Sequence, residues 1–351
     1  MQEIVECPDN LVYISHAEKG YTRIKRGRGF SYHLHNGDRI ENPKIVERIK
    51  ALGIPPMWKK VWICQDPNGH LQATGYDQKN RKQYIYHQDW VTFRNLAKFN
   101  RIREFGLALP SIREYTSAHL QEKGWPKEKV ISLVIQMMDE YHIRIGNQYY
   151  KEQNETFGVT TLRRKHLDFE QGVGRLEYKA KSGKYRKINL QNNQLTKLVK
   201  ECADLPGYEI FTYRDVNKKY QSISSQDVNE HLHQIAGESF SCKDFRTWGG
   251  TIMTVEKREI ALEEIKENPR LKLESTLVKK VAQELGNTLS VCREYYMHPL
   301  ILEKAVLEDF DAKAYMSKKK LKLSNKHKSL LRESETVVLN ILNEFDCKAT
   351  K

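Results

Sequence analysis

The chain has 351 residues and a formal net charge of +14, with 59 Lys or Arg residues against 45 Asp or Glu residues. Its length favours about two domains, and its basic surplus favours a polyanionic partner, most often nucleic acid, over the alternative of a merely basic protein. There is no run of about 18 apolar residues and no secretory signal, so we expect neither a membrane-spanning helix nor export.

The cysteines and the short motifs argue against several kinds of site. The six cysteines are scattered without a CxxC pair, which favours reduced thiols in a cytoplasmic protein over disulfides or a zinc site. Neither HExxH nor GxxxxGK(S/T) occurs. We therefore expect no metal site, no P-loop and no cofactor.

Residues 1–90 are expected to be rich in strands, with a helix only at 43–52. Short apolar or aromatic stretches alternate there with turn signals, at 30–34, 61–63 and 84–86. From about residue 90 the apolar period becomes helical, and helices are predicted at 90–107 and 111–123.

A clearer helix is predicted at 126–143, because Pro126 suits a first helical turn and the apolar residues follow a 3.6-residue period. We expect its apolar stripe to be core: Val130, Leu133, Val134, Met137, Met138 and Tyr141. The next segment predicts a three-stranded antiparallel meander, with strands at 159–169, 175–180 and 185–190.

Helices are expected to dominate from Ser225 onward, one of them ending at Leu285-Gly286 with a C-terminal glycine. The basic run at 318–322 is interpreted as a solvated helix face, with DNA contact as the minority alternative. A last amphipathic helix, docked on the body, is predicted by the spacing of Val337, Val338, Ile341, Leu342 and Phe345.

Four places carry residues of chemical interest: Arg144 after the helix at 126–143, the lysine-rich hairpin tip at 179–184, the pair Lys243 and Arg246, and the tyrosines at 295–296. Lys243 and Arg246 lie three apart and share a helix face, which Ser241 is expected to cap. Taken singly, each place has an ordinary explanation as a helix-dipole partner, a solvated cation or a packed aromatic ring.

Together these residue types complete a reaction. Attack on a phosphodiester needs a nucleophile, neutralisation of the phosphoryl oxygens and a proton for the leaving alkoxide. Two arginines can bind the nonbridging oxygens, and a lysine can donate the proton. A tyrosine, with an ordinary pKa of about 10, is favoured as phenolate by nearby guanidinium groups, and a phenolate leaves well enough to make the step reversible.

The order of these residues, ending with a polar residue nine positions before a tyrosine, resembles the type IB DNA topoisomerases, specifically their small poxvirus-like bacterial branch. The resemblance covers roughly residues 10–310 and extends to further segments at 21–32, 75–77, 81–86 and 154–162. It implies that Tyr296 attacks the scissile phosphate, forms a 3′-phosphotyrosyl bond and releases a 5′-hydroxyl. Arg144 and Arg246 would then bind the nonbridging oxygens.

The resemblance also implies that Lys181 protonates the leaving 5′-oxygen, with Lys184 as the alternative, and that Lys243 supports the DNA backbone or the proton relay. Viral and eukaryotic members carry histidine where this chain has Asn287. An amide can still donate a hydrogen bond to a phosphoryl oxygen, but it supplies no imidazolium charge.

Most of the DNA contacts that the resemblance implies are of a kind that positions a duplex without reading its sequence. They fall to Arg23, Lys25, Arg26, Arg28, Arg81, Gln83, Tyr84, Tyr86, Tyr150 and Thr161. Gln83 could also touch a base edge. The alternative for Tyr84 and Tyr86, which share one strand face, is packing in the core.

We expect an α+β protein with three parts: a mostly β DNA-clamp lobe at 1–90, a mainly helical catalytic lobe at 91–311 and a basic helical tail at 312–351. The implied protein is a monomer clamped around double-stranded DNA at the nucleoid. It relaxes positive and negative supercoils without ATP or metal.

Two alternatives are kept. A tyrosine recombinase or integrase shares the catalytic logic, but usually has His-x-x-Arg where this chain has Lys243 to Arg246, together with a helical N-terminal lobe. A noncatalytic basic DNA-binding protein would not need Arg144, Lys181, Arg246 and Tyr296 together.

Overall fold

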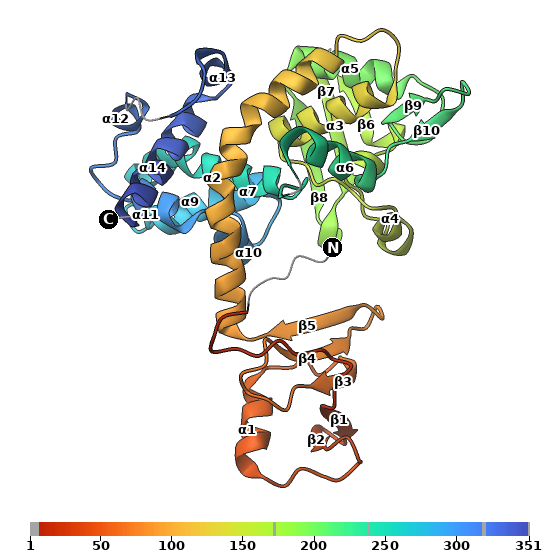
Figure 1. The fold of residues 1–351 in the computed structure, drawn as a ribbon, viewed down its shortest axis with the longest axis vertical. Coiled ribbons are helices and arrows are strands. Elements are labelled where there is room, and N and C mark those ends of the chain that lie inside the picture. Colours follow the sequence, from red (N-terminus) through yellow and green to blue (C-terminus); the bar gives the residue numbers. More distant parts are fainter. Residues whose placement is uncertain (1–6, 171–172, 238, 318–320, 350–351) are drawn as a thin grey trace. The chain divides into compact units, whose positions relative to one another are not determined.

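The computed structural model describes residues 7–170, 173–237, 239–317 and 321–349, and its chain divides into two compact units, Met1–Lys98 and Phe99–Lys351 (Figure 1). Each unit has its own architecture. Helix α2 (Gln88–His119) begins in the first unit and continues into the second. Among the described residues, no helix is both long and apolar enough to cross a membrane.

The first unit is a five-stranded antiparallel sheet with one helix. Its strands are β1 (Tyr21–Arg26), β2 (Gly29–His33), β3 (Lys59–Ile63), β4 (Leu71–Tyr76) and β5 (Lys82–Tyr86). They lie in the order β2-β1-β3-β4-β5, so the strand-rich prediction is confirmed. The predicted helix is α1 (Pro43–Ala51), which starts with proline under an Asn42 cap.

The prediction of two helices at 90–107 and 111–123 is wrong, because α2 runs without a break from Gln88 to His119. Pro110 lies inside it. A proline removes one backbone donor and usually breaks or kinks a helix. Here buried residues on both sides of Pro110, Phe105, Leu109 and Ile112, anchor the helix in the main core of the second unit.

Helix α3 (Lys127–Tyr141) matches the predicted helix closely. Of the predicted stripe, Val130, Leu133, Val134, Met137 and Met138 are fully buried, whereas Tyr141 is half-buried at the edge of the core. The helix ends at His142, whose backbone is left-handed. That abrupt end directs the following residues, including Arg144, into a loop.

The three-stranded meander is confirmed as β6 (Leu167–Glu170), β7 (Val173–Lys179) and β8 (Tyr185–Leu190), in that order in the sheet. Its first strand is shorter than predicted. Residues Val159–Thr161 and Arg164–His166 form 3-10 turns instead, the first because Val159 and Thr160 donate to the carbonyls of Arg144 and Ile145.

The remaining elements are mainly helical, as predicted. The helices are α4 (Gln148–Asn154), α5 (Asn193–Ala203), α6 (Ser225–Ala236), α7 (Asp244–Glu256), α8 (Arg258–Glu267), α9 (Leu273–Leu285), α10 (Leu289–Tyr295), α11 (Pro299–Ala305), α12 (Ala312–Met316), α13 (Asn325–Ser329) and α14 (Glu333–Ala349). A small hairpin, β9 (Thr212–Arg214) with β10 (Tyr220–Ser222), precedes α6.

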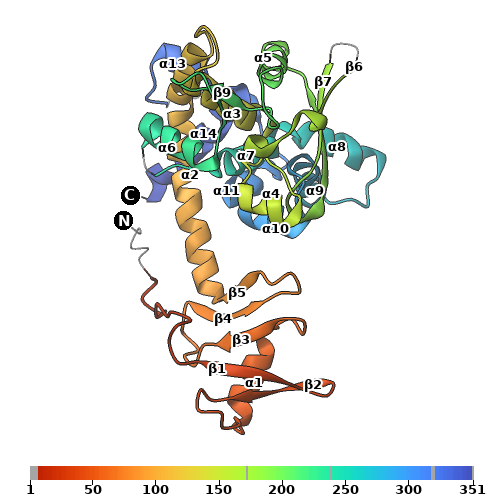
Figure 2. The same cartoon turned by 90° about the vertical axis from the view of Figure 1, so that its right-hand side faces the viewer.

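Helix α7 is the hub of the second unit. It packs against α3, α8, α9, α11 and α14, and Figure 2 shows it among these helices. Eleven of its residues are buried, from Asp244 to Thr254. A residue on this helix is therefore held on several sides at once.

Helix α14 confirms the predicted last helix, with Val337, Val338, Ile341 and Leu342 buried. The side chain of Phe345 lies outside the described residues. So do residues 318–320 of the basic run, whereas Leu321 and Lys322 are described and not helical.

Candidate active site

The loop that carries Arg144 is fixed by its neighbour in space, the segment at 158–160. The carbonyl of Arg144 accepts the Val159 N–H at 2.8 Å, and Thr160 donates to Ile145 at 2.8 Å. Gly158 allows this approach, since a Cβ atom there would lie 2.5 Å from the Arg144 carbonyl oxygen and 2.4 Å from the Gly146 nitrogen. Thr161 closes the turn by bonding both backbone groups of Gly158 at 3.0 Å.

Arg246 is a buried guanidinium, with only 3% of the residue exposed. Its Nη1 donates to the carbonyl of His142 at the end of α3, and its Nη2 donates to the Leu285 carbonyl at the end of α9, at 2.7 Å. Its Nε is buried without a hydrogen-bond partner among the described residues. Burial and the charge of Arg144 lower the pKa of Arg246 to about 10, so the guanidinium remains charged at neutral pH.

Asn287 is placed by the end of α9. Gly286 adopts the left-handed conformation there (φ +62°) and turns the chain, which confirms the predicted glycine signal. The side-chain oxygen of Asn287 accepts a hydrogen bond from Arg144. Its Nδ2 is buried and has no partner among the described residues. The amide therefore holds Arg144 with one atom and keeps a donor available with the other.

Tyr296 lies directly after α10, with its ring against Arg246. The Cζ of Arg246 is 5.3 Å from the ring centroid, and the guanidinium also hydrogen-bonds the phenol. Gly250 on α7 leaves room for this segment, since a Cβ atom there would lie 2.4 Å from the Tyr296 carbonyl oxygen.

The environment of Tyr296 favours its phenolate. Burial alone raises the pKa of Tyr296, but the positive charges of Arg246, Arg144 and Lys243, together with the hydrogen bond from Arg246, lower it below its ordinary value overall. The neighbouring tyrosine behaves in the opposite way. Burial and the carboxylate of Glu294 raise the pKa of Tyr295 to about 12. The surroundings of the two phenols thus favour the phenolate at Tyr296 over that at Tyr295.

His142 lies close to this site without adding charge to it. Burial lowers the pKa of His142 to about 3, so its imidazole is neutral at neutral pH. Its ring packs on Gly249 of α7, where a Cβ atom would lie 2.5 Å from Nδ1. His142 therefore does not replace the imidazolium that Asn287 lacks.

Lys243 precedes α7 and is exposed, but its charge acts on the Tyr296 phenol. The expectation that Ser241 caps this helix is wrong, because the Ser241 hydroxyl donates a hydrogen bond to the first helical residue and, among the residues described, accepts none from the helix backbone. Ser241 donates from its N–H and its hydroxyl to the Asp244 carboxylate at 2.8 and 3.0 Å, and Lys243 occupies the cap position without a side-chain bond. This turn fixes the start of the helix that presents Arg246.

Lys181 and Lys184 lie at the tip of the β7–β8 hairpin, which closes through a short turn at Lys181–Gly183 with Ser182 left-handed (φ 64°). Lys181 is exposed and Lys184 is half-buried. Close to the tip, Tyr178 pairs with Arg186 across the hairpin; burial raises the pKa of Tyr178, and the charges of Arg186, Arg246 and Arg144 oppose that rise. The hairpin is thus anchored beside the arginines, and the role of either lysine stays a prediction.

Arg186 is a residue that sequence reasoning missed. It donates to the Glu284 carbonyl at the end of α9, and its side chain lies against Gly286. Its charge also bears on Arg246 and His142. A signal was available, because β8 alternates exposed residues with Arg186, Ile188 and Leu190 on the inward face. An arginine on the inward face of a strand is expected to have a hydrogen-bond acceptor nearby, and this expectation would have singled out Arg186.

The predicted DNA-facing residues of the first unit fall into two groups. Lys25, Arg26 and Arg28 are exposed on β1 and the turn after it. Arg23, in contrast, donates to the carbonyls of Ile54, Pro55 and Trp58 at 2.9–3.0 Å. Its guanidinium holds the segment before β3, so its position is explained without any phosphate contact.

The β5 edge strand presents its aromatic residues outward. Tyr84 and Tyr86 are 46% and 42% exposed, and their rings stack with centroids 6.0 Å apart. Packing in the core is therefore excluded for them. Arg81 and Gln83 both bond the Asp77 carboxylate, at 2.7 and 3.0 Å.

In the second unit, Tyr150 on α4 is 53% exposed beside Tyr149. Thr161 is only 4% exposed, and its hydroxyl holds Gly158 as described above. It supports the Arg144 loop, and a direct DNA contact from it stays a prediction.

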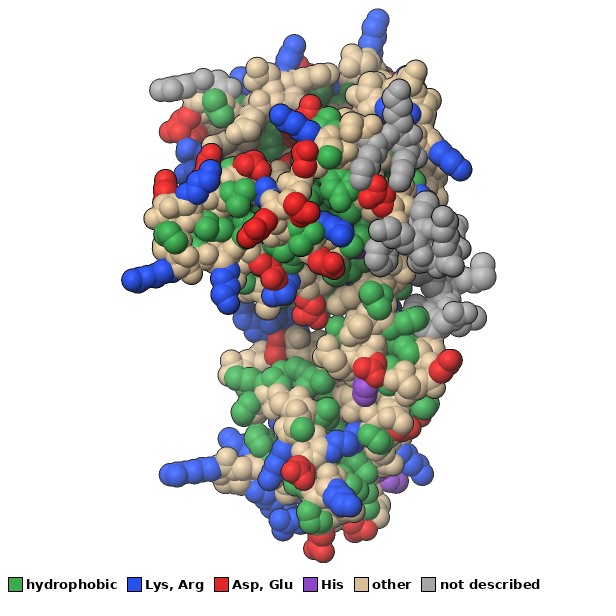
Figure 3. Space-filling view, turned by 90° about the vertical axis from the view of Figure 1, so that its left-hand side faces the viewer, with side chains coloured by type: hydrophobic (Ala, Val, Ile, Leu, Met, Phe, Trp, Pro, Cys, Tyr) green, Lys and Arg blue, Asp and Glu red, His purple; other side chains and the backbone are tan. Residues whose placement is uncertain are grey.

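The described side chains of the second unit that face the viewer in Figure 3 include acidic, basic and apolar ones side by side.

Comparison with known proteins bears directly on this site. The catalytic core of eukaryotic DNA topoisomerase I matches residues 81–326, and the N-terminal domain of bacterial DNA topoisomerase IB matches residues 29–77. DNA topoisomerase 1B of Acanthamoeba polyphaga mimivirus is 31% identical over 300 residues, covering 82% of this chain and 88% of the relative. DNA topoisomerase 1B of Vaccinia virus (strain Copenhagen) is 26% identical over 258 residues, covering 72% and 78%.

Among solved structures, the XerH site-specific recombinase in its post-cleavage complex is similar at a TM-score of 0.33 and 16% identity, over 63% of this chain and 55% of that one. The residues matched by the family include Arg144, Lys181, Arg246, Asn287 and Tyr296, and the two viral relatives cover 82% and 72% of the chain. The chain therefore belongs to the type IB DNA topoisomerases.

Proposed function

We propose that this type IB topoisomerase relaxes both positively and negatively supercoiled DNA through a transient 3′-phosphotyrosyl bond at Tyr296. The observation that carries the proposal is the opposite electrostatics of two adjacent tyrosines. The pKa of Tyr296 is lowered beside Arg246 and Arg144, whereas that of Tyr295 is raised to about 12. A reactive phenolate is thereby favoured at one position only.

In the proposed cleavage step, one bond to phosphorus forms as another breaks. The Tyr296 oxygen bonds to the scissile phosphorus, the bond from phosphorus to the 5′-oxygen breaks, and a proton reaches that oxygen from Lys181 or Lys184. Arg144, Arg246 and the free Nδ2 of Asn287 meet the developing charge on the nonbridging oxygens. Religation is the reverse reaction, and the phosphotyrosyl bond conserves the energy of the phosphodiester, so ATP is not required.

We further propose that the enzyme acts as a monomer enclosing duplex DNA on the nucleoid, in the cytoplasm. The exposed cations Lys25, Arg26 and Arg28 and the outward face of Tyr84 and Tyr86 support a DNA-holding role for the first unit. The tyrosine recombinase alternative is not retained, since the first unit matches a bacterial topoisomerase IB domain.

Plasmid relaxation tests the proposal. The wild type should relax plasmids of either supercoil sign in EDTA without ATP, and Tyr296→Phe should relax neither. A wild type that is inactive without metal or ATP, or a Tyr296→Phe variant that retains relaxation, would overturn it. A noncatalytic DNA-binding protein would leave both plasmids supercoiled in every arm.

A further inference from the structure

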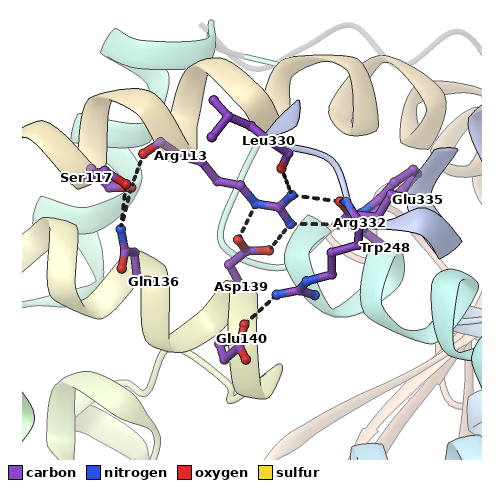
Figure 4. A network of polar contacts seen from close by, with 10 residues as sticks. Arg113, Ser117, Gln136, Asp139, Glu140, Trp248, Leu330, Arg332 and Glu335 are labelled. Carbon is purple, nitrogen blue, oxygen red and sulfur yellow. Dashed lines mark hydrogen bonds and ion pairs between the residues drawn. The ribbon is translucent and has the colours of Figure 1, made fainter. Parts of the chain in front are cut away.

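A buried ion network joins helices α2, α3, α7 and α14 of the second unit. At its centre, Arg113 of α2 donates to the Asp139 carboxylate at 2.7 and 3.0 Å, to the Glu335 carboxylate at 2.6 and 2.7 Å, and to the Leu330 carbonyl at 2.6 Å (Figure 4). A guanidinium has five N–H donors, and these five acceptors use all of them.

Glu335 is the acceptor that ties this network to α14. It is 0% exposed, and its carboxylate also accepts the Trp248 Nε1–H at 3.1 Å and the Arg332 N–H at 2.8 Å. A buried carboxylate is costly to desolvate, and it is tolerated where several donors surround it, as here. Arg332 adds an outer ion pair to Glu140 of α3 at 2.6 Å (Figure 4).

The network reaches both segments that carry the site's arginines. Asp139 lies on the last turn of α3, immediately before His142, whose carbonyl binds Arg246, and before Arg144. Trp248 follows Arg246 on α7 by two positions and is 1% exposed. The Arg113–Glu335 pair therefore links α3, through Asp139, to α7, through Trp248.

Helices α3 and α7 pack so closely that the distance between them leaves little room for change. The His142 ring fills the space over Gly249, and on the other side of α7 the Trp248 ring fills the space over Gly106 of α2, where a Cβ atom would lie 2.3 Å from it. A shift of α7 along α3 would therefore move Arg246 relative to Arg144 and Tyr296. The matched family region ends at residue 326, so α14 and Glu335 lie outside it.

We propose that Glu335, acting through Arg113, Asp139 and Trp248, is a positioning residue that sets the placement of Arg144 and Arg246 against Tyr296. The inference rests on the proposed function, because it assigns these arginines to the cleavage step. Helix α14 then contributes to cleavage by holding the two arginines in place.

The test is single-turnover cleavage of a DNA duplex at a range of pH values. Glu335→Gln keeps the side-chain shape but presents an amide donor to Arg113. We expect it to slow cleavage by about tenfold or more with little change in DNA affinity, because small displacements of charge-stabilising groups are costly. We also expect the apparent pKa of the Tyr296 phenol to rise, since Arg246, Arg144 and Lys243 are what lowers it.

Two controls separate positioning from stability. Glu333→Gln changes an exposed carboxylate on the first turn of the same helix and should leave the rate and the pH profile unchanged. Val337→Ala weakens the docking of α14 without touching the network, and it should lower the melting temperature without moving the pH profile. If Glu335→Gln does not fold, Trp248→Phe removes the bond from α7 to Glu335, keeps an aromatic ring in the core and carries the same expectation.

A wild-type pH profile in Glu335→Gln, or in Trp248→Phe where that variant replaces it, would overturn the inference. A pH shift of equal size in Val337→Ala would overturn it as well. Failure of the proposed function is distinguishable, since it would appear as cleavage by Tyr296→Phe in the same assay.

Discussion

At the residue scale, the reactivity of this site is decided by which charges surround each phenol. Tyr295 and Tyr296 are adjacent, yet Glu294 acts on the first and Arg246, Arg144 and Lys243 act on the second. Sequence alone selected Tyr296 only through its spacing from Asn287 and the family resemblance. The structure adds a physical reason that does not depend on spacing.

The lowered pKa of Tyr296 predicts the direction of the pH dependence. Because the Tyr296 phenolate is the proposed nucleophile, single-turnover cleavage should rise with pH and level off below the ordinary phenol pKa of about 10. Arg246→Gln removes the nearest positive charge, so its profile should move to higher pH in addition to being slower. A wild-type midpoint at or above that of free tyrosine would contradict this reading.

Asn287 and Arg246 should differ in how much they contribute. Arg246 is a buried charge that contacts the phenol and two helix ends, whereas Asn287 contributes a neutral donor and holds Arg144. We expect Arg246→Ala to slow cleavage by about 10³-fold and Asn287→Ala by roughly tenfold. Rapid-quench experiments under saturating enzyme measure the cleavage rates of both variants. Equal losses of rate would contradict this ranking.

At the element scale, the sequence predicted most of the architecture because apolar periodicity and turn residues act locally. The stripe of α3, the glycine end of α9 and the β6–β8 meander were all predictable in this way. The single helix α2 was not, since Pro110 signals a break that burial in the core overrides.

Long-range contacts were also out of reach of the sequence. Arg113 and Glu335 are 222 positions apart, and nothing near either residue indicates its partner. The hydrogen bonds from Arg246 to the carbonyls of His142 and Leu285 could not be predicted either, because every residue has a backbone carbonyl and the residue type therefore does not indicate the acceptor. By contrast, the residue types of the candidate site could be proposed from the sequence, because the proposed cleavage needs a nucleophile, cations that neutralise the phosphoryl oxygens and a proton donor.

Two lysines at the tip of the β7–β8 hairpin, Lys181 and Lys184, are candidates for the proton donor. If Lys181 is the proton donor, Lys181→Ala should slow cleavage by about 10²–10⁴-fold. A substrate whose 5′-bridging oxygen is replaced by sulfur should restore the rate, since a thiolate leaves without a proton. Rescue of Lys184→Ala in place of Lys181→Ala would transfer the role to Lys184.

At the scale of the whole molecule, the chain combines a small antiparallel β unit with a helical unit that holds the entire site. Arg144, Arg246, Asn287 and Tyr296 all come from the second unit, from the ends of α3, α9 and α10 and from the hub helix α7. The residues proposed for cleavage thus come from one unit, while exposed basic and aromatic residues of the other suit the proposed DNA holding. The proposed monomeric clamp would divide the two tasks between them.

The most direct test of this account is to trap the covalent complex and map its attachment. A duplex whose 5′-hydroxyl strand dissociates after cleavage should leave the wild type bound to a DNA 3′ end. Mass spectrometry of the digested complex should find the nucleotide on Tyr296, and Tyr295→Phe should form the complex at close to the wild-type rate. Attachment at Tyr295, or a complex formed by Tyr296→Phe, would contradict the account.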